Sequence, residues 1–139
     1  MAVEITRTDY FYATVRDRPG EAFLVLRELA AGEVNLRAFH AVPLGPNGVQ
    51  LTLFPQSVER LAVVAEKIGL VLDGPHPALL VQGDDRLGAL ADIHNCLADA
   101  GISVFSSSGV TSGPRGFGYV VYVNHGEIDS AVAALRSLG

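Results

Sequence analysis

The stretch Arg16-Asp17-Arg18-Pro19-Gly20-Glu21 decides how the start of the chain folds. The run 10–15 before it alternates and is rich in strand formers, whereas the run 23–29 after it is amphipathic at helical spacing. The stretch is therefore predicted to be the turn between a first strand and a first helix, with Pro19 at the first helical position. Such a turn presents backbone N–H groups that attract anionic groups.

The composition is typical of a compact globular chain. Of 139 residues, 49% are hydrophobic and 18% are charged, with a formal net charge of -5. The absence of a basic cluster argues against nucleic acid as a partner, and no apolar run approaches the roughly 20 residues of a membrane span. The single cysteine excludes an internal disulfide, and the four histidines share no metal-ligand spacing. No signal-peptide pattern opens the chain, so we expect a cytoplasmic protein. We also expect it to hold no metal and no cofactor.

The element order reads βαββαβ and then begins again. The first half is expected to contain strands at 10–16, 34–42, 49–53 and 70–72 and helices at 19–31 and 58–68, with a separate short strand at 3–6. The second half is expected to contain strands at 79–82, 102–110 and 117–123 and helices at 87–100 and 128–138. Hairpin turns are expected at 43–48 and 113–116.

The two halves align at a constant offset of 68 residues, which indicates an internal duplication. The matching landmarks are Gly20 with Gly88, Val34 with Ile102, and the turn 45–48 with the turn 113–116. We expect an α+β fold of two ferredoxin-like domains, residues 1–74 and 75–139, with the seam at His76-Pro77. Each domain would pack two helices on one face of an antiparallel sheet.

The second copy ends at Gly139, directly after its second helix, and so lacks a last strand of its own. We expect another segment to fill that sheet edge, because an open edge invites uncontrolled pairing. The candidates are Val3 to Thr6 and the strand at Leu70.

The turn and the segment after the first helix resemble the ACT domain family. That family shows an Asp-x-Pro-Gly turn and a Gly-x-Asn-hydrophobic start of strand two, matched here by residues 17–20 and 32–36. The second copy is a degraded version, since Leu87 replaces the proline and Ser103 replaces the asparagine. The resemblance covers nearly the whole chain and implies a stand-alone tandem ACT protein. ACT domains bind small regulatory ligands, most often amino acids, between paired domains.

The resemblance and the chemistry of the turn together give two candidate sites. Binding residues at the first would be Asp17, Arg18, Pro19, Gly20, Glu21, Asn35 and Leu36, and those at a weaker second site would be Asp84, Asp85, Leu87, Gly88 and Ser103. The helix start would bind the ligand carboxylate, Gly20 would allow close approach, and Asp17 or Asn35 would accept from the ammonium. The alternatives are that Asp17 only caps the helix, and that the second site is a structural copy without ligand.

The favoured function is therefore a regulatory module, without enzymatic activity, that binds an amino acid and acts through domain pairing or a homodimer. A partner enzyme would respond to the arrangement that the ligand stabilises. The alternative is an interaction subunit of a metabolic enzyme that binds nothing small. An enzyme of the split βαβ fold is the weakest possibility, because no frame of catalytic residues stands out.

Overall fold

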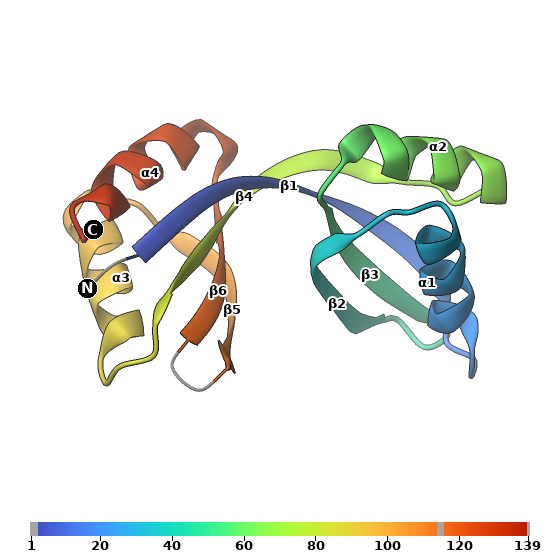
Figure 1. Cartoon of the computed structure of the whole chain (residues 1–139), viewed down its shortest axis with the longest axis horizontal. Coiled ribbons are helices and arrows are strands. Elements are labelled where there is room, and N and C mark those ends of the chain that lie inside the picture. The colour runs from blue at the N-terminus through green and yellow to red at the C-terminus, as the bar shows by residue number, and fades with distance from the viewer. Residues whose placement is uncertain (1–2, 114–115, 139) are drawn as a thin grey trace. The chain divides into compact units, whose positions relative to one another are not determined.

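The computed structural model describes residues 3–113 and 116–138, and within them the chain forms six β-strands, four α-helices and one 3-10 helix (Figure 1). The chain divides into two compact units. The first unit holds residues 9–76, and the second joins the N-terminal residues up to Thr8 to the chain from Pro77 onward. The changeover at His76 and Pro77 lies at the expected seam. None of the described helices is long and apolar enough to cross a membrane.

The elements follow the duplicated order that the sequence predicts. Those of the first half are β1 (Val3–Arg16), α1 (Glu21–Ala31), β2 (Leu36–Leu44), β3 (Gly48–Pro55), α2 (Val58–Ile68) and β4 (Asp73–Asp84). Those of the second half are α3 (Ala89–Asp99), β5 (Val104–Ser112), β6 (Gly116–Val123), the 3-10 helix η1 (His125–Glu127) and α4 (Ile128–Arg136).

The first unit is an antiparallel sheet with the strand order β2-β3-β1, followed by the beginning of β4. Alternate residues of β1 and β3 point to the side where α1 and α2 pack, because side chains alternate between the faces of a strand. The buried core there consists of Phe11, Ala13, Val25, Leu29, Val34, Leu51, Leu53, Leu61 and Val64. Ser57 caps α2, as predicted, by accepting from the N–H of Arg60 at 3.2 Å.

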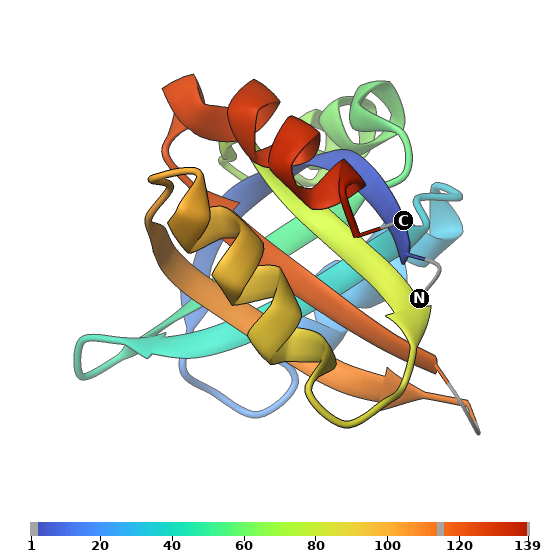
Figure 2. The ribbon, with the colours of Figure 1, turned by 90° about the vertical axis from the view of Figure 1, so that its left-hand side faces the viewer.

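The second unit repeats this arrangement with the strand order β5-β6-β4, and its fourth strand is the beginning of β1. Figure 2 shows α3 and α4 lying over one face of this sheet. Val3 and Ile5 pack against the core of this unit, and Arg7 forms an ion pair with Asp129 of α4. Val3 to Thr6 therefore fills the edge that the second copy leaves open, whereas Leu70 to Leu72 lie outside any strand.

Two expected strand boundaries are wrong for the same reason. The separate strands at 3–6 and 10–16 form one 14-residue strand, and β4 likewise runs through the expected seam at His76. Each of these long strands contributes one end to each unit, so the strand continues through a polar run or a proline inside it. The compact units accordingly differ from the expected ranges 1–74 and 75–139 in that residues 3–8 group with the second unit and residues 75–76 with the first.

The duplication extends to the backbone conformation. Gly20 and Gly88 have φ angles of 85° and 84°, and Gly45 and Gly113 have 69° and 68°. The register repeats as well, because Arg16 pairs with Gly48 and Asp84 pairs with Gly116. The fold is therefore α+β, with two ferredoxin-like βαββαβ units, as the sequence predicts. The tip of the expected turn at 113–116, residues 114–115, lies outside the described residues.

Candidate ligand-binding site

The first turn leaves the start of α1 without a side-chain cap. Helix α1 begins at Glu21, and Gly20 occupies the N-cap in the left-handed region, so Pro19 lies in the turn and not at the first helical position. Only glycine adopts this φ without strain, which moves the helix start to Glu21, two residues past the proline. Asp17 does not cap the helix; its N–H donates to the carbonyl of Asn47 at 2.8 Å and ties the turn to the β2–β3 hairpin.

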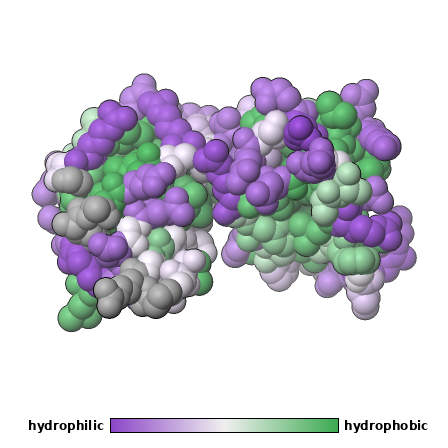
Figure 3. Space-filling model, in the orientation of Figure 1, coloured by the Kyte–Doolittle hydropathy of each residue, from purple (hydrophilic) through white to green (hydrophobic). Residues whose placement is uncertain are grey.

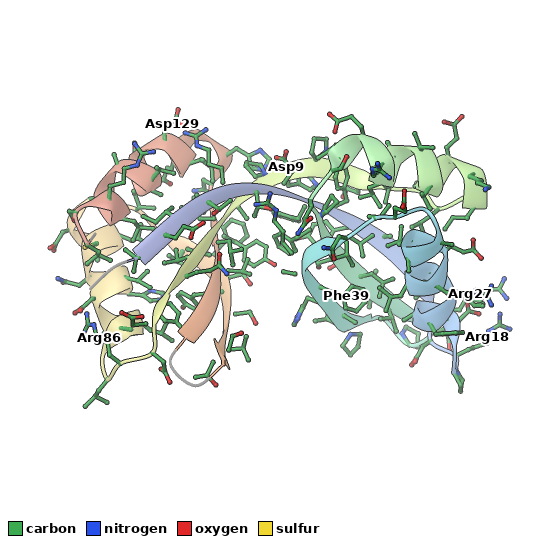
Figure 4. The ribbon with its side chains drawn as sticks, in the orientation of Figure 1. Asp9, Arg18, Arg27, Phe39, Arg86 and Asp129 are labelled. Carbon is green, nitrogen blue, oxygen red and sulfur yellow. The ribbon has the colours of Figure 1, made fainter. Side chains whose placement is uncertain are left out.

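A carboxylate of the chain itself already lies at this first helix start. Arg18 donates from Nη2 and Nε to Oε1 of Glu21, at 2.7 Å and 3.1 Å. Figure 4 shows Arg18 at the turn end of α1. The Glu21 side chain is only 23% exposed and lies in the first helical turn, where the helix dipole favours negative charge. Glu21 therefore competes with an external anion for both Arg18 and the helix start.

Asn35 and Leu36, the other half of the first predicted site, lie at the far end of α1. The 11 residues of this helix separate them from the turn by about 16 Å at 1.5 Å per residue. Asn35 is exposed and its carbonyl accepts from the N–H of Gln56 at 2.9 Å, while Leu36 packs against the core. Within one unit, a small amino acid cannot touch both groups.

The second turn has the same backbone but a different side chain at the helix start. Gly88 is the N-cap of α3, again without a side-chain cap, and Ala89 stands at the position of Glu21. Arg86, which corresponds to Arg18, reaches farther along α3 to Asp92 and also donates to the carbonyl of Leu87 at 3.3 Å. The first position of α3 thus carries no carboxylate, and the acidic residue of its first turn is Asp92, which pairs with Arg86.

A cleft of about 580 Å³ opens at this second turn, within the second unit. It is bounded by the turn, the first residues of α3 and the edge strand β5. Its lining is Asp85, Arg86, Leu87, Gly88, Ala89, Leu90, Ala91, Gly109, Val110, Thr111, Phe117 and Gly118. The volume lies within the range of small-molecule sites, roughly 300–1,000 Å³.

Small residues replace larger ones where this cleft opens. Ala91 stands where the first unit has Phe23, and Gly109 stands where it has Ala41. Both replacements put a smaller side chain at a position that lines the cleft.

The cleft offers three kinds of contact to a ligand. The N–H of Ala89 donates to the carbonyl of Arg86 at 3.2 Å, and the next N–H groups in the first turn of α3, those of Leu90 and Ala91, suit a carboxylate. The carboxylate of Asp85 suits an ammonium group. Leu87, which is fully exposed, and Leu90 and Val110 supply apolar surface. Figure 3 shows hydrophobic surface between hydrophilic regions on both units. The combination fits a zwitterion with an apolar side chain.

Three of the predicted second-site residues line the cleft, namely Asp85, Leu87 and Gly88. Asp84 does not, and Ser103 lies beyond the far end of α3. Sequence reasoning missed Arg86, the start of α3 and the contribution of β5. The signal for them was in the repeat itself: aligning the halves at offset 68 shows alanine and glycine where the first copy has Phe23 and Ala41.

We expect Gly88→Ala to lower the free energy of unfolding by about 1 kcal/mol, because an L-residue is strained in the left-handed region. A Cβ at Gly88 meets no atom within 4 Å, so backbone strain is the only cost. Gly118→Ala is the matched control, since its Cβ also meets open space but its φ is not positive. Urea unfolding of both variants measures the difference, and equal losses would contradict the assignment.

We expect Gly109→Ala to cost more, about 1–3 kcal/mol, because the added methyl group overpacks the sheet. Its Cβ would lie 2.8 Å from Cδ1 of Tyr119, a ring that is 5% exposed. Thermal unfolding measures this loss. An unchanged midpoint would show that the ring moves aside freely.

The chain matches no protein-family model and no curated protein sequence. Solved structures do match. Protein BT0572 from Bacteroides thetaiotaomicron superposes with a TM-score of 0.81 at 14% identity, over 96% of this chain and 89% of that one. The regulatory subunit of aspartate kinase from Thermus thermophilus gives 0.68 at 14% identity, over 97% and 95%. A structure of the aspartokinase alpha and beta subunits gives 0.60 at 19% identity, over 99% and 96%. At these identities the likeness shows the fold alone, which consists of two ferredoxin-like βαββαβ units.

Proposed function

We propose that the chain is a regulatory module, without catalytic activity of its own, that binds an amino acid with an apolar side chain in the cleft of the second unit. The observation that carries the proposal is the cleft itself, which lies against an uncapped helix start and has apolar walls. The fold likeness to a protein described as a regulatory subunit of aspartate kinase supports a regulatory role.

Regulation would work through differential affinity. A ligand in the cleft would contact the turn 85–88, α3 and the edge strand β5 at once, and so would favour the conformation in which these three are held together. A second copy of the chain, or a partner enzyme in the cytoplasm, would bind that conformation better. The two affinities are then coupled by thermodynamic linkage.

Thermal unfolding with each common amino acid at millimolar concentration tests the proposal. A ligand at ~100 times its dissociation constant adds about 2.7 kcal/mol of stability. In a chain of this size that raises the midpoint by about 5–10 °C. We expect leucine-like amino acids to raise it and acidic or basic ones to leave it unchanged. No shift with any amino acid would contradict the proposal.

The exposed apolar side chains support a second candidate, an interaction subunit that binds no small molecule. Leu87 is fully exposed, and Val110 and Phe105 are 69% and 59% exposed. Apolar side chains at such exposure are costly to leave in water and are typical of surfaces that contact another protein. A thermal midpoint that rises with the concentration of the protein, but is not raised by any amino acid, would favour this function over ligand sensing.

A further inference from the structure

A hydrogen-bonded chain of three side chains joins α3, β6 and β5 in the second unit. Tyr119 Oη donates to Oγ of Ser107 at 2.7 Å, and it lies 2.6 Å from Nε2 of His94. Because the hydroxyl has one proton and gives it to Ser107, Nε2 of His94 must be the donor in the other bond. The chain therefore runs in one direction, from the helix through the buried tyrosine to the edge strand.

The first unit has no counterpart to this chain. The positions 68 residues earlier are Leu26, Leu51 and Phe39, and all three are apolar. Leu51 is fully buried in the core of the first unit, so the fold accepts an aliphatic side chain at this point. A buried hydroxyl is costly unless it is hydrogen-bonded, and its net gain when bonded is small. The needs of the fold alone do not account for three matched polar residues.

The chain meets the cleft at Gly109. This residue pairs with Tyr119 across the β5–β6 ladder and lines the cleft. Its missing side chain leaves room for the tyrosine ring, since a Cβ there would lie 2.8 Å and 3.3 Å from two ring carbons. The ring thus lies directly against the backbone that forms one side of the cleft. Strand β5 is at the sheet edge and is exposed along nearly its whole length.

We infer that Tyr119 is a positioning residue for the cleft. Held by His94 of α3 and by Ser107 of β5, it fixes the edge strand at Gly109 against the helix that forms the opposite wall. Both walls are then in place before the ligand arrives, which lowers the entropy lost on binding. The inference rests on the proposed function for the identity of the ligand, but the fixing of β5 is independent of it.

Tyr119→Phe tests the inference, because it removes the hydroxyl and leaves the ring under Gly109. Tyr122→Phe is the control, since Tyr122 lies on the same strand but points to the other sheet face. Hydrogen exchange of the full chain is followed in β5, with and without millimolar L-leucine. In Tyr119→Phe we expect amide exchange at 107–111 to be faster by about fivefold, the equivalent of one net hydrogen bond, and the dissociation constant for L-leucine to rise by a similar factor. Tyr122→Phe should change neither.

Two results would overturn the inference: exchange in β5 that does not differ between the two variants, or faster exchange with unchanged L-leucine affinity. If the unmodified chain binds no amino acid, the proposed function fails, and the exchange result alone then decides whether Tyr119 fixes β5. The double variant His94→Leu with Tyr119→Leu gives a second measurement, because it places in the second unit the leucines that the first unit has at Leu26 and Leu51. It should lower the thermal midpoint, because leucine leaves part of the ring's space beside Gly109 empty, and it should also show the faster exchange at 107–111. Exchange at the rate of the unmodified chain would contradict the inference.

Discussion

Deletion of residues 1–8 is expected to unfold the second unit. Residues 3–8 supply its fourth strand, with Val3 and Ile5 packed against its core and Thr8 buried. Two half-buried aliphatic side chains contribute about 1 kcal/mol each, and the lost backbone hydrogen bonds contribute a comparable amount, so we expect a loss of about 3–5 kcal/mol. That is a large part of the roughly 5–15 kcal/mol that stabilises a typical domain.

Hydrogen exchange along the chain measures this effect. The deleted chain should lose protection in β4, β6, α3 and α4, and should expose the β4 edge to association. Ile5→Ala and Glu4→Ala form the matched pair of point variants, since Ile5 contacts the core and Glu4 is exposed. We expect Ile5→Ala to lower the free energy of unfolding by about 1 kcal/mol and Glu4→Ala to leave it almost unchanged. Full protection of β4 and β6 in the deleted chain would show that residues 3–8 do not complete the sheet of the second unit.

The second large effect is expected from closing the cleft. Ala91→Phe introduces at the exposed start of α3 the residue that the first unit has at Phe23, which is itself 61% exposed. The ring would occupy the space between the helix and β5. We expect the dissociation constant for L-leucine to rise by about 100-fold or more, since a ligand must displace the ring or bind outside the cleft, a difference of about 2.8 kcal/mol.

Ala98→Phe is the control for this substitution. Ala98 lies on the same helix and is also exposed, but it does not line the cleft. The free energy of unfolding of both variants should stay within about 0.5 kcal/mol of that of the unmodified chain, because exposed helix positions tolerate such changes. Calorimetric titration compares them. Equal affinities in the two variants would place the ligand somewhere other than this cleft.

The repeat and the fold could be predicted because their signals are local. Glycines at left-handed positions and the alternation of apolar residues depend only on nearby backbone, and Gly20 and Gly88 have nearly the same φ. The continuity of β1 could not be predicted in this way. Polar Arg7, Thr8 and Asp9 interrupt its apolar pattern, whereas in the structure Thr8 is buried inside the strand.

The preference between the two turns shows the limit of motif reasoning. The first turn keeps the Asp-Pro-Gly pattern and so ranked higher, but its Arg18 is paired with Glu21, a carboxylate in the first turn of α1. The cleft at the second turn is lined by Ala91 and by Gly109, which are on different elements and far apart in the sequence. Binding at the first turn stays a prediction, as does the homodimer.

A titration of the isotope-labelled chain with L-leucine, followed by amide chemical shifts, tests the central claim most directly. We expect the amides of 85–91 and 109–111 to shift together and saturate, while those of the first turn, 17–21, do not move. Shifts confined to 17–21, or no saturable shift anywhere in the chain, would contradict the assignment of the second-unit cleft as the ligand site.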